Sequence, residues 1–145
     1  MKNQLKKIKL AFGLFLVILL IQQTSYGQTA VSTADALKNL NEYLKIFNPD
    51  VYKDVEIKEN NIIFNYKVSG AVFSSVMDIA QLKAATIKKQ ISFGANEVRI
   101  VCSNESYCIY SHYEDDGTNH FRFYSYTVKD LSTLETLITD LISTL

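Results

Sequence analysis

The chain has 145 residues, a one-domain length, and its fifteen basic and fifteen acidic side chains give a formal net charge of zero. All fifteen acidic residues lie after residue 27 and four of the basic ones lie before it, so the remainder holds 11 basic and 15 acidic side chains, a net charge of −4. This balance, without a basic stripe, argues against binding to nucleic acid and against a polybasic membrane patch.

The N-terminal segment has the order of a secretory signal peptide. Four lysines stand among the first nine residues, an apolar run covers 10–21, and Ser25 and Gly27 supply the small residues of a cleavage site. The run has 12 residues, fewer than the about 20 that span a bilayer. We therefore expect residues 1–27 to be removed on export. A chain that begins at Gln28 resembles many periplasmic and surface proteins of Gram-negative bacteria, so we expect a periplasmic or extracellular location, with no stable membrane span after cleavage.

Residues 28–32 are predicted to be a flexible leader, and 33–145 a single domain. A helix is expected to start at Ser32 or Thr33, since either hydroxyl can cap the free N–H groups of the first turn. The helix should end before Pro49, because the residue that precedes a proline avoids the helical region. Apolar residues at spacings of three and four mark its buried face: Leu37, Leu40, Leu44 and Phe47.

The next segment predicts a β-hairpin. Two alternating stretches, residues 51–58 and 62–68, flank an Asn-Asn dipeptide at 60–61. Asparagine tolerates the positive φ of a two-residue hairpin turn. With the turn at this dipeptide, Ile57 faces Phe64 on the apolar side of the hairpin.

Further strands are expected in the middle of the chain. Residues 71–77 alternate as a third strand, whereas 78–92 is interpreted as a short turn of helix or an irregular crossing. Strands are then predicted at 97–103 and 106–113. A stretch rich in aromatic and β-branched residues, 120–128, is predicted to be the last strand.

The chain is predicted to close with a helix over residues 130–145. Asp130 or Ser132 can cap it, and Ser132 with Glu135 matches the spacing of a capping box. The order of elements predicts an α+β fold. Its expected form is an N-terminal helix, one antiparallel sheet of about six strands and a C-terminal helix, with both helices packed on one face of the sheet.

The two cysteines, Cys102 and Cys108, fall on either side of a predicted hairpin loop. An odd loop, 103–107, places them opposite each other and allows a disulfide, whereas an even loop, 103–106, directs them to opposite faces and leaves two buried thiols. An exported protein meets an oxidising compartment, which favours the bond. A bond between these two cysteines would close a short loop, so its entropic stabilisation of the fold would be small. The spacing is not C-x-x-C, so no redox activity is predicted.

Chemistry-bearing clusters are few. His112 and His120 flank the acidic turn at 114–116, but no third ligand of suitable type is apparent and the turn lacks EF-hand spacing. The sequence contains no G-x-S-x-G, H-E-x-x-H or phosphate-binding glycine loop. We therefore predict no metal, no cofactor and no enzymatic activity.

The aromatic strand supplies the candidate site. Alternation sends Phe121 and Phe123 to one face and the residues between and beyond them to the other. Tyrosine offers a large contact area with a polar tip, which suits binding, although it equally suits a sheet face that simply meets solvent. We predict a non-enzymatic binding module for a protein or small ligand, and the residues expected to bind are Tyr110, Arg122, Tyr124 and Tyr126.

Two alternatives stay open. A small periplasmic hydrolase would use His112 or His120 as its acid–base group. A structural or assembly subunit would instead show a large exposed apolar patch.

Overall fold

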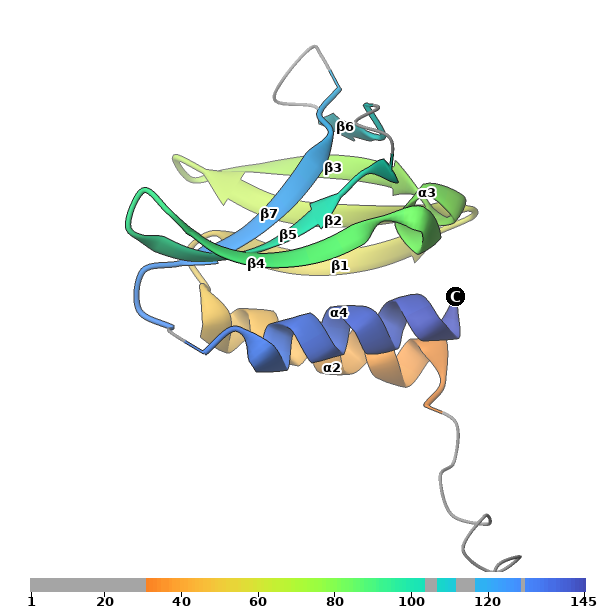
Figure 1. Cartoon of the computed structure of the whole chain (residues 1–145), viewed down its shortest axis with the longest axis horizontal. Helices are drawn as coiled ribbons and strands as arrows, with labels where there is room; N and C mark the ends of the chain where they lie inside the picture. Colours follow the sequence, from red (N-terminus) through yellow and green to blue (C-terminus); the bar gives the residue numbers. More distant parts are fainter. Residues whose placement is uncertain (1–30, 104–106, 112–116, 129) are drawn as a thin grey trace, which may run out of the picture. The chain divides into compact units, whose positions relative to one another are not determined.

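The computed structural model describes residues 31–103, 107–111, 117–128 and 130–145. The predicted signal peptide lies outside them. The described part of the chain is α+β, with three helices and seven strands (Figure 1). The elements are α2 (Thr33–Phe47), β1 (Tyr52–Lys58), β2 (Asn61–Val68), β3 (Ala71–Asp78), α3 (Ile79–Ala84), β4 (Thr86–Ser92), β5 (Ala95–Val101), β6 (Ile109–Ser111), β7 (His120–Ser125) and α4 (Ser132–Thr144).

The strands form two antiparallel sheets, so the prediction of one sheet is wrong. One sheet has the order β1-β2-β3-β6 and the other β4-β5-β7. The predicted hairpin between β5 and β6 does not form, because β5 pairs with β4 and β7 while β6 pairs with β3. An isolated bridge joins Ile109 of β6 to Thr118, two residues before the start of β7.

Helix α2 begins and ends where the sequence predicts. The Ser32 hydroxyl accepts a hydrogen bond from the Asp35 backbone N–H at 3.1 Å, and Asn48 is the C-cap. Helix α4 differs from the prediction at its start, since Ser132 lies inside the helix and no capping box forms. The Ser132 N–H instead donates to the Asp130 carboxylate at 2.9 Å, and this hydrogen bond lowers the pKa of Asp130 below its usual value.

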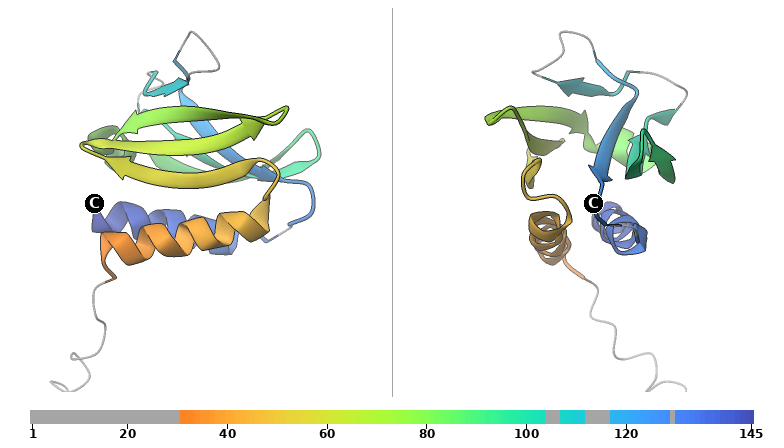
Figure 2. Two further views of the ribbon diagram at one scale, coloured as in Figure 1. Left: turned by 180° about the vertical axis from the view of Figure 1, so that it is seen from behind. Right: turned by 90° about the vertical axis from the view of Figure 1, so that its left-hand side faces the viewer.

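The two long helices run antiparallel. The start of α2 lies beside the end of α4, where the Thr33 hydroxyl donates to the Thr144 carbonyl at 2.8 Å. Figures 1 and 2 show the pair side by side, with α2 beneath β1 and α4 beneath the three-stranded sheet. Asn41 of α2 hydrogen-bonds both the N–H and the C=O of Val55 in β1. Each helix therefore covers a different sheet.

The β1-β2 hairpin forms, but its turn is shifted by one residue. The turn residues are Glu59 and Asn60, so Ile57 pairs with Ile62 rather than Phe64. Glu59 takes the positive φ, 55°. Asn60, at the second turn position, donates from its side chain to the Asp78 carboxylate at 2.7 Å. The apolar faces agree with the prediction, because moving the turn by one position changes the pairing by two residues.

Residues 78–92 contain the short helix α3, in agreement with one of the two interpretations of this segment, and then strand β4, which was not predicted. Asp78 caps α3 by accepting from the Ala80 N–H at 2.7 Å. Strand β4 turns into β5 through Phe93-Gly94, both at positive φ (50° and 79°), as a two-residue hairpin requires. Two consecutive lysines, Lys88 and Lys89, interrupt the apolar–polar alternation of β4, so the sequence pattern did not identify this strand.

An aromatic cluster fills the space between the sheets. The rings of Phe64 and Phe121 stack at 4.4 Å between centroids, and Phe123 lies edge-on to both. Tyr52 extends the cluster toward α2, with its ring 5.2 Å from that of Phe123 and 6.3 Å from that of Phe47. The helices contribute Leu40, Leu44, Leu134, Ile138 and Leu141 to the same core.

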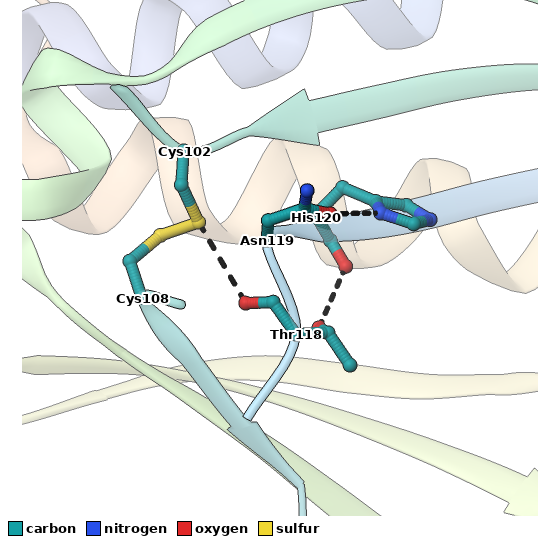
Figure 3. The surroundings of a disulfide bond; sticks show 5 residues. All are labelled: Cys102, Cys108, Thr118, Asn119 and His120. Carbon is teal, nitrogen blue, oxygen red and sulfur yellow. Dashed lines mark hydrogen bonds between the residues drawn. A yellow bond between two sulfur atoms is a disulfide. The ribbon is translucent and has the colours of Figure 1, made fainter. Parts of the chain in front are cut away.

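The sulfur atoms of Cys102 and Cys108 lie at bonding distance, 1.91 Å, with 5.9 Å between the Cα atoms (Figure 3). The pair joins the end of β5 to the start of β6, and therefore one sheet to the other, rather than crossing a hairpin. The Cys102 N–H donates to the carbonyl of Asn119, and the Cys108 N–H to that of Thr118. The start of β7 is thereby held at the junction of the two sheets.

Candidate functional site

The outer face of β7 carries most of the predicted site. Phe121 and Phe123 are buried, whereas Arg122 and Tyr126 are exposed and Tyr124 is half-buried. The alternation predicted for this strand is therefore confirmed. Arg122 and Tyr124 share the outer face of β4-β5-β7, and Tyr126 follows directly beyond the strand.

A row of three cations crosses this face. Lys88 of β4 pairs in register with Arg99 of β5, which in turn pairs with Arg122 of β7. Like charges directly opposite each other in adjacent strands destabilise a sheet. The row therefore destabilises the free protein, and other interactions must offset this repulsion. We call the surface formed by these cations and the neighbouring tyrosines the basic face: Lys88, Arg99, Arg122, Tyr124 and Tyr126.

Glu97, two residues before Arg99 on the same face of β5, supplies part of that compensation. It is only 2 % exposed, although it lies on the outer side of β5. Its carboxylate is 2.9 Å from Nε of Arg99 and 3.9 Å from Nη1 of Arg122, and it accepts a hydrogen bond from Gln90 at 3.3 Å. One carboxylate against three cations leaves a net positive face.

The aromatic half of the basic face lies beside the arginine. The guanidinium carbon of Arg122 is 5.9 Å from the centroid of the Tyr124 ring. The Tyr124 and Tyr126 rings meet edge to face at 6.0 Å. Tyr124 also packs against the core, whereas Tyr126 is 67 % exposed. A partner would therefore contact mainly Tyr126 and the cationic side chains.

Tyr52 closes the edge of β7 that faces away from β5. Its hydroxyl accepts from the Tyr124 N–H at 2.8 Å and donates to the Arg122 carbonyl at 3.1 Å. A side chain thus takes the place of a neighbouring strand and protects an open sheet edge. Burial raises the pKa of the Tyr52 hydroxyl well above its usual value, so the group stays protonated.

We expect Tyr52→Phe to lower the free energy of unfolding by about 1.5 kcal/mol, because a backbone N–H and a C=O would each lose a buried partner. The wild-type protein should also lose stability as pH rises above about 10, since the unfolded chain releases the proton that the folded state keeps. The variant lacks this group and should show a shallower decline. Urea unfolding at neutral and alkaline pH measures both effects. Equal slopes for the two proteins would contradict this role.

Tyr110 does not belong to the basic face, so the predicted four-residue site is divided. It lies in β6 of the other sheet, paired with Val76 and 65 % exposed. There it lines a separate cavity of about 410 Å³ together with Tyr107 and Asp78. A single sheet with β6 beside the last strand would bring Tyr110 to the other three residues, but β6 and β7 belong to different sheets.

The histidines are only partly described. His112 and the acidic turn at 114–116 lie outside the described residues. The ring Nδ1 of His120 is 2.8 Å from Oδ1 of Asn119, and the Thr118 hydroxyl donates to the His120 carbonyl at 2.9 Å (Figure 3). Within the described part of the chain, no three His, Cys, Asp or Glu side chains gather as a metal site would require.

Sequence reasoning missed Lys88 and Arg99. Arg99 lay in a predicted strand, but its pairing with Lys88 required β4, which was not predicted. A signal was present, because β-branched residues recur in β4 and a Phe-Gly turn precedes β5. Interpreting 86–92 as the first strand of a hairpin would have aligned the two cations.

No family model matches the chain, and no curated protein or solved structure is significantly similar to it. Among the helices of the described residues, none has the length and apolar character needed to cross a membrane.

Proposed function

We propose that this protein is an exported, non-enzymatic binding module that captures an acidic partner protein through its basic face. The observation that carries the proposal is the register of Lys88, Arg99 and Arg122 across three strands. Aligned cations are unfavourable in the free protein but become favourable when a partner supplies carboxylates. The exposed Tyr126 beside them adds the aromatic contact that is common in the energetic centres of interfaces.

The charge of the face contrasts with that of the chain. The residues after position 27 carry a net charge of −4, yet this surface has three cations beside a single carboxylate. Lys88 is exposed and makes no ion pair with any residue that the structure describes, so its charge is available to a partner. Such a local patch steers an acidic protein toward one orientation.

Two features support export. The N-terminal segment has the charge and hydropathy order of a cleaved signal peptide. Cys102 and Cys108 lie at disulfide distance, which is compatible with an oxidising compartment. In the compartment that we propose, the periplasm or the cell exterior, the bond would hold the first residues of β7 in place.

Lys88→Glu tests the function without weakening the fold. The new carboxylate would face Arg99 across the strands and should leave stability unchanged or slightly higher. Capture of the partner from an envelope extract should nevertheless fall at least tenfold, because an attraction becomes a repulsion. Beads that carry each purified protein, followed by mass spectrometry of what they retain, measure the effect.

Lys83→Glu is the matched control, since Lys83 is exposed on α3 and its reversal changes the net charge equally. Tyr126→Ala should also reduce capture, because it removes an exposed aromatic contact rather than a charge. If Lys88→Glu and Lys83→Glu retain the same partners in the same amounts, the basic face is not the binding surface. If wild-type beads retain no partner specifically, the binding function itself is wrong.

A further inference from the structure

In the described part of the chain, three of the four sheet edges are closed by a group that takes the place of a neighbouring strand. Tyr52 closes β7 through its hydroxyl, as described above. At β1, the Asn41 side chain bonds both the N–H and the C=O of Val55. At β6, Thr118 exchanges two backbone hydrogen bonds with Ile109. Folded proteins commonly protect their sheet edges from unwanted pairing in such ways.

Strand β4 forms the fourth edge, which is open. The order β4-β5-β7 leaves one side of β4 without a neighbouring strand. Among the described residues, no backbone or side-chain group forms a hydrogen bond to the backbone of β4 on that side. The strand extends over seven residues, Thr86–Ser92. An extended peptide can add to such an edge as a further strand, held by backbone hydrogen bonds.

The contacts of Tyr52 determine which backbone groups of β4 face the open edge. The Tyr124 N–H and the Arg122 C=O bond the Tyr52 hydroxyl, so these two residues of β7 direct their backbone groups away from β5. In an antiparallel sheet, both members of such a pair direct their backbone groups away from each other. Their partners in β5, Glu97 and Arg99, therefore form backbone hydrogen bonds with β4.

The same alternation assigns the backbone groups of β4. Gln90 and Lys88 pair with Glu97 and Arg99, so their N–H and C=O groups face β5. The residues that alternate with them direct their backbone groups to the open edge: Ile87, Lys89 and Ile91. Three N–H donors and three C=O acceptors therefore line this edge and can pair with an added strand.

The side chains of β4 favour an acidic segment. Lys88 ends the row that it forms with Arg99 and Arg122, so the residue opposite Lys88 in an added strand would be the next member of the row. A carboxylate at that position would pair with Lys88, and opposite charges on adjacent strands stabilise a sheet. On the other face of β4, Ile91 is 77 % exposed and offers an apolar contact to the same segment.

A second copy of this chain fits the edge less well. If two β4 strands paired antiparallel along their full length, Lys89 would lie opposite the same lysine of the second copy. Like charges directly opposite each other destabilise such a pairing, and edge lysines are a common protection against it. We propose that the open edge of β4 binds an extended acidic segment of the partner protein as an added strand. This inference rests on the proposed function and names the form in which the partner binds.

Three peptides test the mode of binding on the wild-type protein. The first has seven residues that alternate glutamate and valine, with blocked ends. We expect it to cause saturable shifts in the ¹H–¹⁵N spectrum and to slow hydrogen exchange at least tenfold at the amides of Ile87, Lys89 and Ile91. The second peptide has lysine in place of glutamate and should bind at least tenfold more weakly, because it repels Lys88. The third is the first peptide N-methylated at every residue, and it should bind at least tenfold more weakly because it has no backbone donors.

Two variants at one position separate the backbone from the side chain. Ile91→Pro removes an outward N–H without removing a hydrogen bond to β5, a placement that edge strands tolerate, and should weaken binding of the first peptide at least tenfold. Ile91→Ala is the matched control, because it truncates the side chain but keeps the N–H, and should weaken binding less than threefold. The comparison of the first and third peptides needs no variant, so it decides the proposal even if Ile91→Pro does not fold.

The proposal would be overturned by the absence of saturable binding up to millimolar peptide, or by equal affinity for the first peptide and either of the other two. Equal binding by folded Ile91→Pro and Ile91→Ala would overturn it as well. Partner capture separates this inference from the proposed function. Loss of capture in Lys88→Glu with unchanged capture in Ile91→Pro would retain the basic face and exclude strand addition. Peptide binding at β4 without any captured partner would contradict the proposed function alone.

Discussion

Replacement of Phe123 by Ala is expected to lower the free energy of unfolding by about 4 kcal/mol. The side chain is 1 % exposed and its ring lies within 6 Å of three other aromatic rings, those of Tyr52, Phe64 and Phe121. Truncation would leave a void that the two sheets, tied together at the cysteine pair, cannot easily close. Urea unfolding followed by circular dichroism measures the loss.

Phe93→Ala is the matched control for this substitution. Phe93 is 95 % exposed at the tip of the β4-β5 hairpin, so its removal should change stability by no more than about 0.5 kcal/mol. A loss below about 1 kcal/mol for Phe123→Ala would mean that the aromatic cluster is not the centre of the core.

Glu97→Gln should cost about 2.5 kcal/mol, the second-largest effect that we expect from a single substitution. The change keeps the shape of the side chain but removes the charge that lies 2.9 Å from Arg99. Three aligned cations would then repel each other without a carboxylate between them. Because Arg122 is half-exposed, added salt should screen part of this repulsion and recover part of the loss.

Glu42→Gln provides the comparison, since Glu42 pairs with Lys38 at 4.0 Å on the exposed side of α2 and should contribute little to stability. The measurement is denaturant unfolding at low and at moderate salt. A Glu97→Gln protein as stable as the wild type at low salt would show that the cations need no compensation, and the electrostatic account of the basic face would fail.

Local signals in the sequence predicted the elements that depend on neighbouring residues. Ser32 and Pro49 bound α2 because capping and the restriction before proline act within one turn. Alternation placed Phe123 inside and Arg122 outside because each strand has only two faces. These inferences needed no knowledge of which strands are paired.

The pairing of strands is where the prediction failed. Period-two alternation identifies the side of a strand that faces the core but not its neighbour, so β5 was joined to β6 instead of β7. Ser132 fitted a capping box by spacing, yet the chain brings Asp130 to its N–H. A cleft of about 450 Å³ between the two sheets could not be foreseen either, because its walls come from strands of both sheets.

The salt dependence of partner binding tests the central claim, recognition by the basic face, most directly. With the partner recovered by capture, its affinity should be measured for the wild type, Lys88→Glu and Lys83→Glu over a range of sodium chloride concentrations. We expect the wild-type affinity to fall as salt rises, Lys88→Glu to bind more weakly with a shallower dependence, and Lys83→Glu to follow the wild type. An affinity that is independent of salt and equal in all three proteins would contradict recognition through aligned cations.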